Sequence, residues 1–371
     1  MAQRILQFGT SRFLQAHVDL FVHQARQSGQ DIGPITIVKT TVGEARGGRL
    51  GALNKATGFP VILRGFDNGH LIDETIIVKS VTEALDAHGQ WRRLVELFVD
   101  ETELVVSNVG DNGYEVSPQD ELQLPTHDTV PSSYPAKLLA LLLRRFENGA
   151  APLLILPCEL VSNNGRVLRK LLTNLSESWN LSPAFRHWFF ESVMICNTLV
   201  DRIVSESIDP VGAIAEPYGL WAIRREPGLI PPFQHPSVIY TDDLEPFSRL
   251  KLHILNLGHT FLAEIWKAEK RPDAETVRDI LQDPKVKNRI ISLYQEEVIP
   301  GFSAHGMTEQ ATAYVATTLE RFENPFLNHR IGDIALGHDR KIERRIADFV
   351  SWVSTKEPTL KLARLRALAG M

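Results

Sequence analysis

Residues 4–20, RILQFGTSRFLQAHVDL, place a short β-rich run, one glycine and a helical stretch in direct succession. Strand, glycine turn and helix in this order are typical of a dinucleotide-binding βα unit, whose turn approaches a phosphate group. Gly9 takes the first position of the G-x-G-x-x-G pattern, but Ser11 and Leu14 take the second and third. The turn alone is therefore equally compatible with another kind of doubly wound domain.

Strand-like and helical segments continue to alternate as far as residue 200. The β-rich runs after the first are ITIVKT, FPVIL, TIIVKSV, ELVVSNV, PLLILPCEL and ESVMICNTLV. The clearest helical stretch between them is SYPAKLLALLLRRFENG, which ends in a glycine stop. This alternation predicts an α/β domain with a Rossmann-like, doubly wound and mostly parallel sheet.

The pattern changes in the last third of the chain. Residues 216–243 are proline-rich and irregular, and we interpret them as the connection between two units. Beyond them the chain carries helical periodicity and no convincing strand. The sequence therefore predicts a dinucleotide-binding domain over residues 1–243 and an all-α substrate and catalytic domain over residues 244–371.

The composition argues against nucleic acid and membranes as partners. The 371 residues include 40 basic and 45 acidic side chains, a formal charge of −5, which gives no electrostatic reason to expect nucleic acid or an anionic membrane. No apolar stretch reaches the ~18 residues that a membrane span requires. We expect a cytoplasmic monomer or small homo-oligomer. Cys158 and Cys196 lie in apolar runs, which favours buried thiols, and no metal-ligand spacing is found.

Several polar residues are placed where a doubly wound sheet meets its cofactor. Thr40 follows the second strand, where the acidic residue that usually binds the adenosine ribose is absent, so the choice between NAD, the cofactor named first here, and NADP stays open. Arg46 and Arg49 could reach a 2′-phosphate or could simply be solvated. Ser107 and Asn108 end the run ELVVSN, at the carboxyl edge of the predicted sheet.

The most informative segment is KLHILNLGHT, residues 251–260, which opens a helix that is apolar nearly all round. At about 100° per residue, Asn256 lies near 140° and His259 near 80° from Lys251, so the three side chains share less than half of the circumference. An ammonium, an amide and an imidazole in a buried helix carry a desolvation cost unless a ligand uses them. The alternative is a structural polar cluster with Lys251 reaching solvent.

The spacing K-x-x-x-x-N-x-x-H resembles the signature of the polyol-specific long-chain dehydrogenases, the mannitol dehydrogenase family, and the fuller string resembles its tagaturonate and fructuronate reductase branch. ILQFGTSRFLQAHVD is similar to that family's first Rossmann turn, although Ser11 stands where many members have a second glycine. The segments PCELVSNNG, LVDRI, EPYGLWAI and YTDDLEPF also resemble the family. The residues at matching positions are Gly9, Phe13, Ala16, His17, Asn164, Gly165, Asp201 and Arg202.

The resemblance implies metal-independent hydride transfer between a nicotinamide cofactor and the carbonyl carbon of an open-chain sugar derivative. The residues agree, since a reduced ketone needs a proton donor and hydrogen-bond donors at its oxygen. Lys251 is expected to be the general acid and base, Asn256 and Asn164 the amide donors, and His259 the group that orients Lys251 or binds a hydroxyl.

The resemblance implies tagaturonate or fructuronate as the substrate. The long form of the family is longer than this chain. Asp201 and Arg202 could bind substrate or form a structural ion pair, and Arg330 is a candidate for a substrate carboxylate because guanidinium matches carboxylate. One alternative is a polyol dehydrogenase of the mannitol or arabinitol type. Another, from a different class, is a nucleotide-sensing protein without activity, against which Lys251, Asn256 and His259 argue.

Overall fold

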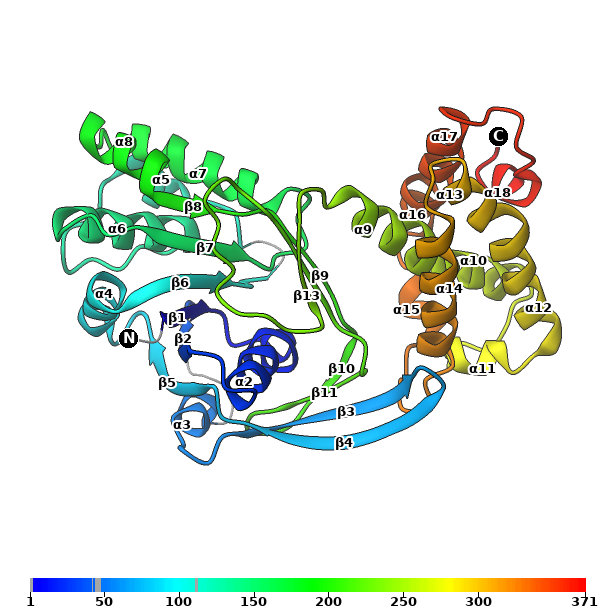
Figure 1. Ribbon diagram of the computed structural model, residues 1–371, viewed down its shortest axis with the longest axis horizontal. Helices are drawn as coiled ribbons and strands as arrows, with labels where there is room; N and C mark the ends of the chain where they lie inside the picture. The colour runs from blue at the N-terminus through cyan, green and yellow to red at the C-terminus, as the bar shows by residue number, and fades with distance from the viewer. Residues whose placement is uncertain (1–2, 42, 44–47, 111–112) are drawn as a thin grey trace. The chain divides into compact units, whose positions relative to one another are not determined.

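The computed structural model describes residues 3–41, 43, 48–110 and 113–371 (Figure 1). The chain divides into two compact units, and neither is continuous in sequence. The first unit comprises Met1–Ile62, Thr75–Ala215 and Gly219–Leu244, and the second comprises Leu63–Glu74, Glu216–Tyr218 and Glu245–Met371. Within the described ranges, no helix has the length and apolar content that crossing a bilayer requires.

A parallel six-stranded sheet is the centre of the first unit, which confirms the predicted Rossmann-like class. The strand order is β5-β2-β1-β6-β7-β8, and every neighbouring pair runs parallel. The central strands are nearly continuous apolar runs, as expected of strands buried on both faces. The strands are β1 (Gln3–Phe8), β2 (Ile32–Lys39), β5 (Val81–Asp86), β6 (Thr102–Ser107), β7 (Leu153–Pro157) and β8 (Val193–Ile195).

Helices of the first unit follow the strands and cover the sheet. The side chains of α4, α6, α7 and α8 form one apolar core with residues of the strands beneath them. Cys158 and Cys196 are buried free thiols, as predicted. The helical segments are α1 (Arg12–Leu14), the π-helical turn η1 (Gln15–Asp19), α2 (Leu20–Gln27), α3 (Arg49–Leu53), α4 (Trp91–Asp100), α5 (Pro118–Leu122), α6 (Tyr134–Glu147), α7 (Asn164–Ser178) and α8 (Pro183–Ser192).

Two of the predicted central strands belong instead to a separate four-stranded sheet of order β10-β11-β3-β4. Asn68 and Gly69, both with positive φ, form the two-residue turn between β3 and β4. Such a turn is typical of a β-hairpin. The prediction that FPVIL and TIIVKSV are strands of the parallel sheet was therefore wrong. The strands are β3 (Phe59–Asp67), β4 (His70–Val78), β10 (Val204–Ser207) and β11 (Ala213–Ala215).

The segment predicted as an irregular connection is also more regular than expected. Residues 216–243 contain β12 (Leu220–Arg224) and β13 (Val238–Thr241), which pair in parallel. β12 also pairs antiparallel with β9 (Thr198–Asp201), completing a three-stranded sheet. The proline-rich residues form the long loop between the two paired strands, so the interpretation as a plain connection was wrong.

The part of the second unit from Glu245 onward is helical, as predicted, and the described residues from 270 to the end contain no strand. Its core surrounds α10, which is apolar nearly all round. The elements are α9 (Glu245–Leu250), η3 (Lys251–Asn256), α10 (Leu257–Ala268), α11 (Val277–Leu281), α12 (Pro284–Leu293), η4 (Tyr294–Val298), α13 (Ile299–Ser303), α14 (Thr308–Phe322), α15 (Ile331–Ala335), α16 (His338–Ile342), η5 (Glu343–Ala347), α17 (Asp348–Ser354) and α18 (Ala363–Leu368).

A buried ion pair ties the short segment Glu216–Tyr218 to α14 within the second unit. Arg321 contacts both carboxylate oxygens of Glu216, at 2.8 and 2.9 Å, and each side chain is only 2% exposed. The guanidinium carbon also lies 4.4 Å from the centre of the Tyr218 ring. A charge pair this deeply buried is stable only while both partners are present.

We therefore expect Arg321→Met to lower the free energy of unfolding by about 3–5 kcal/mol, because the buried carboxylate of Glu216 loses the guanidinium that neutralises it. The double variant Glu216→Gln/Arg321→Met removes both charges and should recover much of this loss. Equilibrium urea denaturation of the single and double variants measures both values. A double variant as unstable as Arg321→Met would contradict the argument.

Candidate active site

The first βα turn lies where the strand order of the parallel sheet reverses. β1 has β2 on one side and β6 on the other, so the ends of β1 and β6 flank the crevice in which such sheets bind ligands. Gly9 follows β1 with φ +117°, and a Cβ at this position would collide with the carbonyl oxygen of Asn108. Only glycine fits this close approach between the two strand ends.

Ser11 and Asn108 connect the ends of three strands. Ser11 Oγ accepts a hydrogen bond from the Leu14 amide at 3.2 Å and contacts Asn108 Oδ1 at 3.3 Å. Asn108 Nδ2 donates to the carbonyl oxygen of Cys158, after β7, at 2.7 Å. These predicted cofactor residues therefore build one rigid rim along the carboxyl ends of β1, β6 and β7.

Behind this rim lies Glu159, a buried carboxylate that the sequence analysis did not single out. Its Oε2 accepts from the hydroxyls of Ser107 and Tyr114, each at 3.1 Å, and its Oε1 contacts the Val109 amide at 3.3 Å. Burial raises the pKa of Glu159 above its usual value. The Ser107 hydroxyl thus points to Glu159, and an acidic residue directly after an apolar strand is the signal that could have identified this cluster.

The other predicted cofactor residues lie at the same end of the sheet. Phe13 stacks on His17, with ring centres 4.7 Å apart. Arg49 Nη1 donates to the carbonyl oxygen of Thr10 in the turn, at 3.3 Å. Thr40 follows Lys39, whose ammonium pairs with Asp86 at 2.9 Å. Arg46 lies outside the described residues. A glycine turn at the switch point, with a polar rim beside it, fits a dinucleotide.

Asn164 was predicted to donate to a substrate oxygen, and in the structure its amide group is engaged within the first unit. Its Nδ2 lies 3.0 Å from the carbonyl oxygen of Pro157, 3.1 Å from that of Glu159 and 3.3 Å from the Thr198 hydroxyl. Its Oδ1 accepts from the amides of Gly165 and Thr198. Asn164 therefore holds the end of β7 to the start of β9.

Asp201, Arg202 and His17 are also buried in the first unit. The Arg202 guanidinium donates to the carbonyl oxygen of Ala16 and lies 5.1 Å from the centre of the Phe21 ring. His17 Nε2 contacts the carbonyl oxygen of Leu220 at 3.0 Å, and its ring packs between Phe13 and Phe21. These contacts give Arg202 and His17 a packing role in this unit.

In the second unit, Lys251 to Asn256 form a π-helical turn, η3, inside a longer helix. An α-helix would place residues five apart at about 140° from each other. In a π-helix residues i and i+5 are joined by one hydrogen-bonded turn and face the same side. The wide turn therefore brings Lys251 and Asn256 into line, and His259 follows Asn256 by three residues on the same face.

Side chains from η4, η5 and α10 donate hydrogen bonds to carbonyl groups of this turn. Tyr294 donates its hydroxyl to the carbonyl oxygen of Ile254 at 2.9 Å. Arg345 Nη1 donates to the Asn256 carbonyl oxygen at 3.2 Å, and the Thr260 hydroxyl donates to it at 3.0 Å. Gly258 is required beside them, because a Cβ there would collide with the Tyr294 hydroxyl. The π-turn is thus held by its neighbours in the unit.

Lys251 and Asn256 are half-buried, whereas His259 is buried. Among the described residues, none hydrogen-bonds the side-chain amide of Asn256, in contrast to that of Asn164. The His259 ring contacts Phe322 and His329, with ring centres 4.5 and 4.9 Å apart. The predicted trio therefore presents an ammonium, an available amide and an imidazole along one face.

Arg330, the candidate for a substrate carboxylate, is exposed and forms an isolated β-bridge with Thr276. The carbonyl oxygen of its neighbour His329 accepts a hydrogen bond from the Val277 amide at 2.9 Å. Ile331 in turn donates its amide to the carbonyl oxygen of Glu275, at 3.0 Å. The backbone on both sides of Arg330 is thus fixed to the segment before α11.

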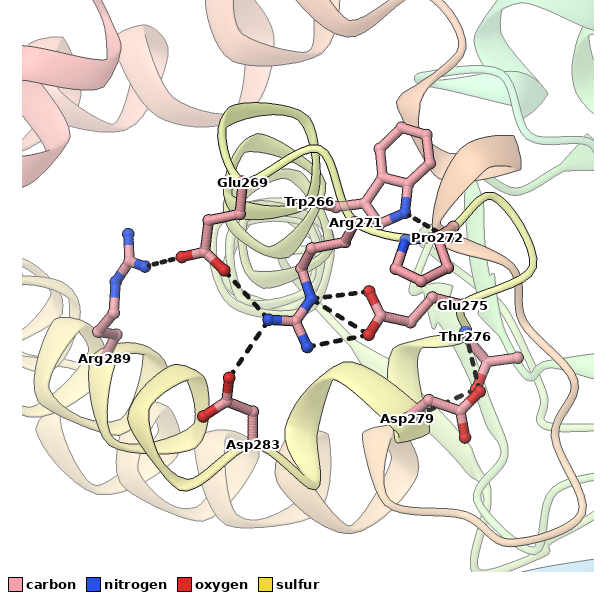
Figure 2. Close-up of polar contacts among 9 residues, drawn as sticks. All are labelled: Trp266, Glu269, Arg271, Pro272, Glu275, Thr276, Asp279, Asp283 and Arg289. Carbon is pink, nitrogen blue, oxygen red and sulfur yellow. Dashed lines mark hydrogen bonds and ion pairs between the residues drawn. The ribbon is translucent and has the colours of Figure 1, made fainter.

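Figure 2 shows how that segment is held. Arg271 contacts both carboxylate oxygens of Glu275, at 2.9 and 3.1 Å, and reaches Glu269 at 3.0 Å and Asp283 at 3.2 Å. Hydrogen bonds to Glu275 raise the pKa of Arg271. Thr276 and Asp279 cap α11 reciprocally. This ion-pair network fixes Glu275 and, through it, residues 329–331.

Two family descriptions match the chain and together cover nearly all of it. Residues 3–229 match the mannitol dehydrogenase Rossmann domain, and residues 243–369 match the mannitol dehydrogenase C-terminal domain. Similar proteins include altronate oxidoreductase of Bacillus subtilis (strain 168), 28% identical over 369 residues, which cover 92% of this chain and 73% of that protein. The altronate oxidoreductase of Halalkalibacterium halodurans is 30% identical over 397 residues, covering 99% and 75%.

Two solved structures share the fold. Mannitol 2-dehydrogenase of Pseudomonas fluorescens, in a ternary complex with NAD and D-mannitol, gives a TM-score of 0.75 at 19% identity, covering 99% of this chain and 78% of that one. A D-sorbitol dehydrogenase in substrate-free form gives a TM-score of 0.76 at 17% identity. The match covers 100% of this chain and 86% of that one. The matches cover only about three quarters of the two altronate oxidoreductases, so those relatives are longer than this chain, as expected from the resemblance.

The close approach at Gly9 predicts a specific loss of dinucleotide binding. We expect Gly9→Ala to weaken NADH or NADPH binding by at least about tenfold, because the methyl group pushes the turn away from Asn108. Gly29→Ala is the matched control, since Gly29 also has positive φ but no atom within 4 Å of its would-be Cβ. Fluorescence titration with each dinucleotide, with circular dichroism to verify folding, measures the difference. Equal affinities of both variants would refute the role of Gly9.

The contact between Gly258 and Tyr294 predicts energetic coupling between these positions. Gly258→Ala should destabilise the protein by about 1–3 kcal/mol, the usual cost of overpacking. Tyr294→Phe removes the hydroxyl that the new methyl group would meet, so the double variant should be less destabilised than the sum of the two single variants. Urea denaturation of the four proteins gives the coupling energy, and strictly additive values would count against the close contact.

Proposed function

Since the chain belongs to the mannitol dehydrogenase family and is an oxidoreductase acting on CH–OH groups, we propose that it interconverts a keto sugar acid and its hydroxy acid by hydride transfer. The sugar acid is of the tagaturonate or fructuronate type. Similarity to proteins named altronate oxidoreductase supports a sugar acid as substrate. The observation that carries the proposal is the π-turn η3 from Lys251 to Asn256, a geometry that supports placing these two side chains on one side of the helix.

NAD is the proposed cofactor, and NADP is the alternative. When bound, it supplies or accepts the hydride, and the protein contributes geometry and electrostatics. Gly9 and Ser11 would hold it at the first turn, with Phe13, Thr40 and Asn108 around it. Ser107 acts behind them, through Glu159.

Lys251 is the proposed general acid and base. In reduction, the protonated ammonium gives its proton to the carbonyl oxygen as the hydride reaches the carbon. In oxidation, the neutral amine takes the hydroxyl proton. The Asn256 amide donates a hydrogen bond to the same oxygen and stabilises the charge that develops there. His259 orients Lys251 or binds a neighbouring hydroxyl group.

Asn164 is assigned a positioning role that differs from the one expected from the sequence. Its amide hydrogens are directed at Pro157, Glu159 and Thr198, so it keeps the loop after β7 in place. Asp201 and Arg330 remain proposed substrate contacts, and Arg202 supports the segment around Ala16.

A spectrophotometric screen tests the proposal. Oxidation of NADH and NADPH is followed against a panel of keto sugar acids and the matching neutral keto sugars. Faster turnover of a keto sugar acid is the expected result. Turnover of neutral keto sugars alone would favour a polyol dehydrogenase of the mannitol type. No turnover of either class with either dinucleotide would exclude the proposed reaction.

The catalytic assignment predicts a large effect at Lys251. Lys251→Ala should lower kcat by about 10²–10⁴, the range typical of general acid–base residues, while the NADH dissociation constant stays near that of the wild type. An added primary amine should restore part of the activity, since it replaces the proton carrier. Steady-state kinetics and fluorescence titration measure these values. Wild-type turnover by folded Lys251→Ala would make Lys251 structural and the mechanism wrong.

A further inference from the structure

His329 lies beside the predicted catalytic face of the second unit and has no assigned role in the mechanism. Its ring meets the edge of the His259 ring, with centres 4.9 Å apart and planes at 71°. Its Nδ1 is buried and has no hydrogen-bond partner among the described residues. Leaving a buried polar nitrogen unpaired is costly, so such groups call for an explanation such as a missing ligand.

The backbone around His329 is fixed before any ligand binds. The Val277 amide donates to the His329 carbonyl oxygen, and the Ile331 amide donates to the Glu275 carbonyl oxygen. Glu275 is itself held by Arg271 in the network of Figure 2. The imidazole is therefore presented from a rigid segment, as a binding residue requires.

Charges of both signs lie near His329. Lys341 and Asp333 are the charged groups that act on its ring. Lys341 Nζ donates to the carbonyl oxygen of Ile334 at 2.7 Å, and Arg345 Nη1 donates to Asn256 and Thr260. In the part of the chain that the structure describes, no carboxylate lies within ion-pair distance of Lys341 or Arg345. Lys341 and Arg345 are thus half-buried cations without a carboxylate partner among the described residues, and an anion near Lys341 would supply the missing negative charge.

His329 itself is suited to donate one hydrogen bond. Burial lowers its pKa below the usual value of histidine. The ring is therefore neutral at pH 7 and carries one N–H. A neutral donor near the Lys341 ammonium can bind a carboxylate oxygen without adding a further buried charge.

We propose that His329 is a substrate-binding residue that hydrogen-bonds the carboxylate of the sugar acid, and so favours acids over neutral keto sugars. This assignment rests on the proposed function, because it names the end of that substrate which the site recognises. It replaces Arg330 as the principal carboxylate contact. The Arg330 side chain is exposed, whereas His329 packs against His259.

The experiment compares two substrates in matched variants. His329→Phe keeps the ring and its packing but removes both nitrogens, and His329→Gln keeps a hydrogen-bond donor. For a keto sugar acid, His329→Phe should raise KM by about ten- to a hundredfold, the loss of one hydrogen bond to a charged group. The KM of the matching neutral keto sugar, kcat and the NADH dissociation constant should change little. His329→Gln should recover part of the loss.

Asn328→Ala is the control, because Asn328 precedes His329 and is exposed. It should leave both KM values unchanged. Equal increases of KM for the acid and the neutral sugar in His329→Phe would overturn the carboxylate contact, and so would no change in either. A selective loss in Arg330→Gln but not in His329→Phe would assign the carboxylate to Arg330 instead.

Failure of the proposed function gives a different pattern. Wild-type protein that reduces only neutral keto sugars would refute both the sugar-acid substrate and the role of His329. Wild-type protein that oxidises neither dinucleotide with any substrate of the panel would refute the reaction itself. Both results appear before any variant is made, so they are distinct from a failure of His329→Phe alone.

Discussion

Every buried carbonyl group needs a hydrogen-bond donor, and this requirement governs the helix that carries the predicted catalytic residues. A π-turn alters the regular i→i+4 bonding of the helix around it. Here Tyr294 donates to Ile254, and Arg345 and Thr260 donate to Asn256. Without these donors the turn would lose its support, and an α-helical turn would rotate Asn256 away from Lys251.

Two asparagines of the same chain illustrate how environment decides chemistry. The Asn164 amide is enclosed by Pro157, Glu159 and Thr198, so its hydrogens stabilise the fold. The Asn256 side chain is half-buried, and none of the described residues hydrogen-bonds it. Identical groups therefore differ in availability, and an amide serves a substrate only where the protein leaves its hydrogens unused.

The cations of the second unit differ in the same way. Arg271 is surrounded by Glu269, Glu275 and Asp283, which satisfy its charge and make it a structural clamp. Lys341 and Arg345 instead donate to neutral oxygens. An anion near them would supply the missing negative charge, which agrees with a carboxylate-bearing substrate.

The sequence by itself determined the class of the fold and predicted the principal residues of the candidate site. The alternation of apolar runs with helical stretches indicates a sheet that is buried on both faces. The spacing of Lys251, Asn256 and His259 indicates that they share one face of a helix. Both are local periodicities, which a chain displays before it folds. The same reasoning placed FPVIL and TIIVKSV in the parallel sheet, which was wrong, because the apolar pattern of a strand does not determine which sheet the strand joins.

Tertiary structure decided the rest. The π-turn depends on hydrogen-bond donors from η4 and η5, which lie more than thirty residues away in sequence. No local sequence pattern therefore predicts it. The surroundings of Glu159 and His329 arise only after folding, and the hydrogen bonds of the Asn164 amide depend on β7 and β9 meeting. Hydrogen-bond partners and burial are properties of packing between distant segments, and for that reason only the folded chain reveals them.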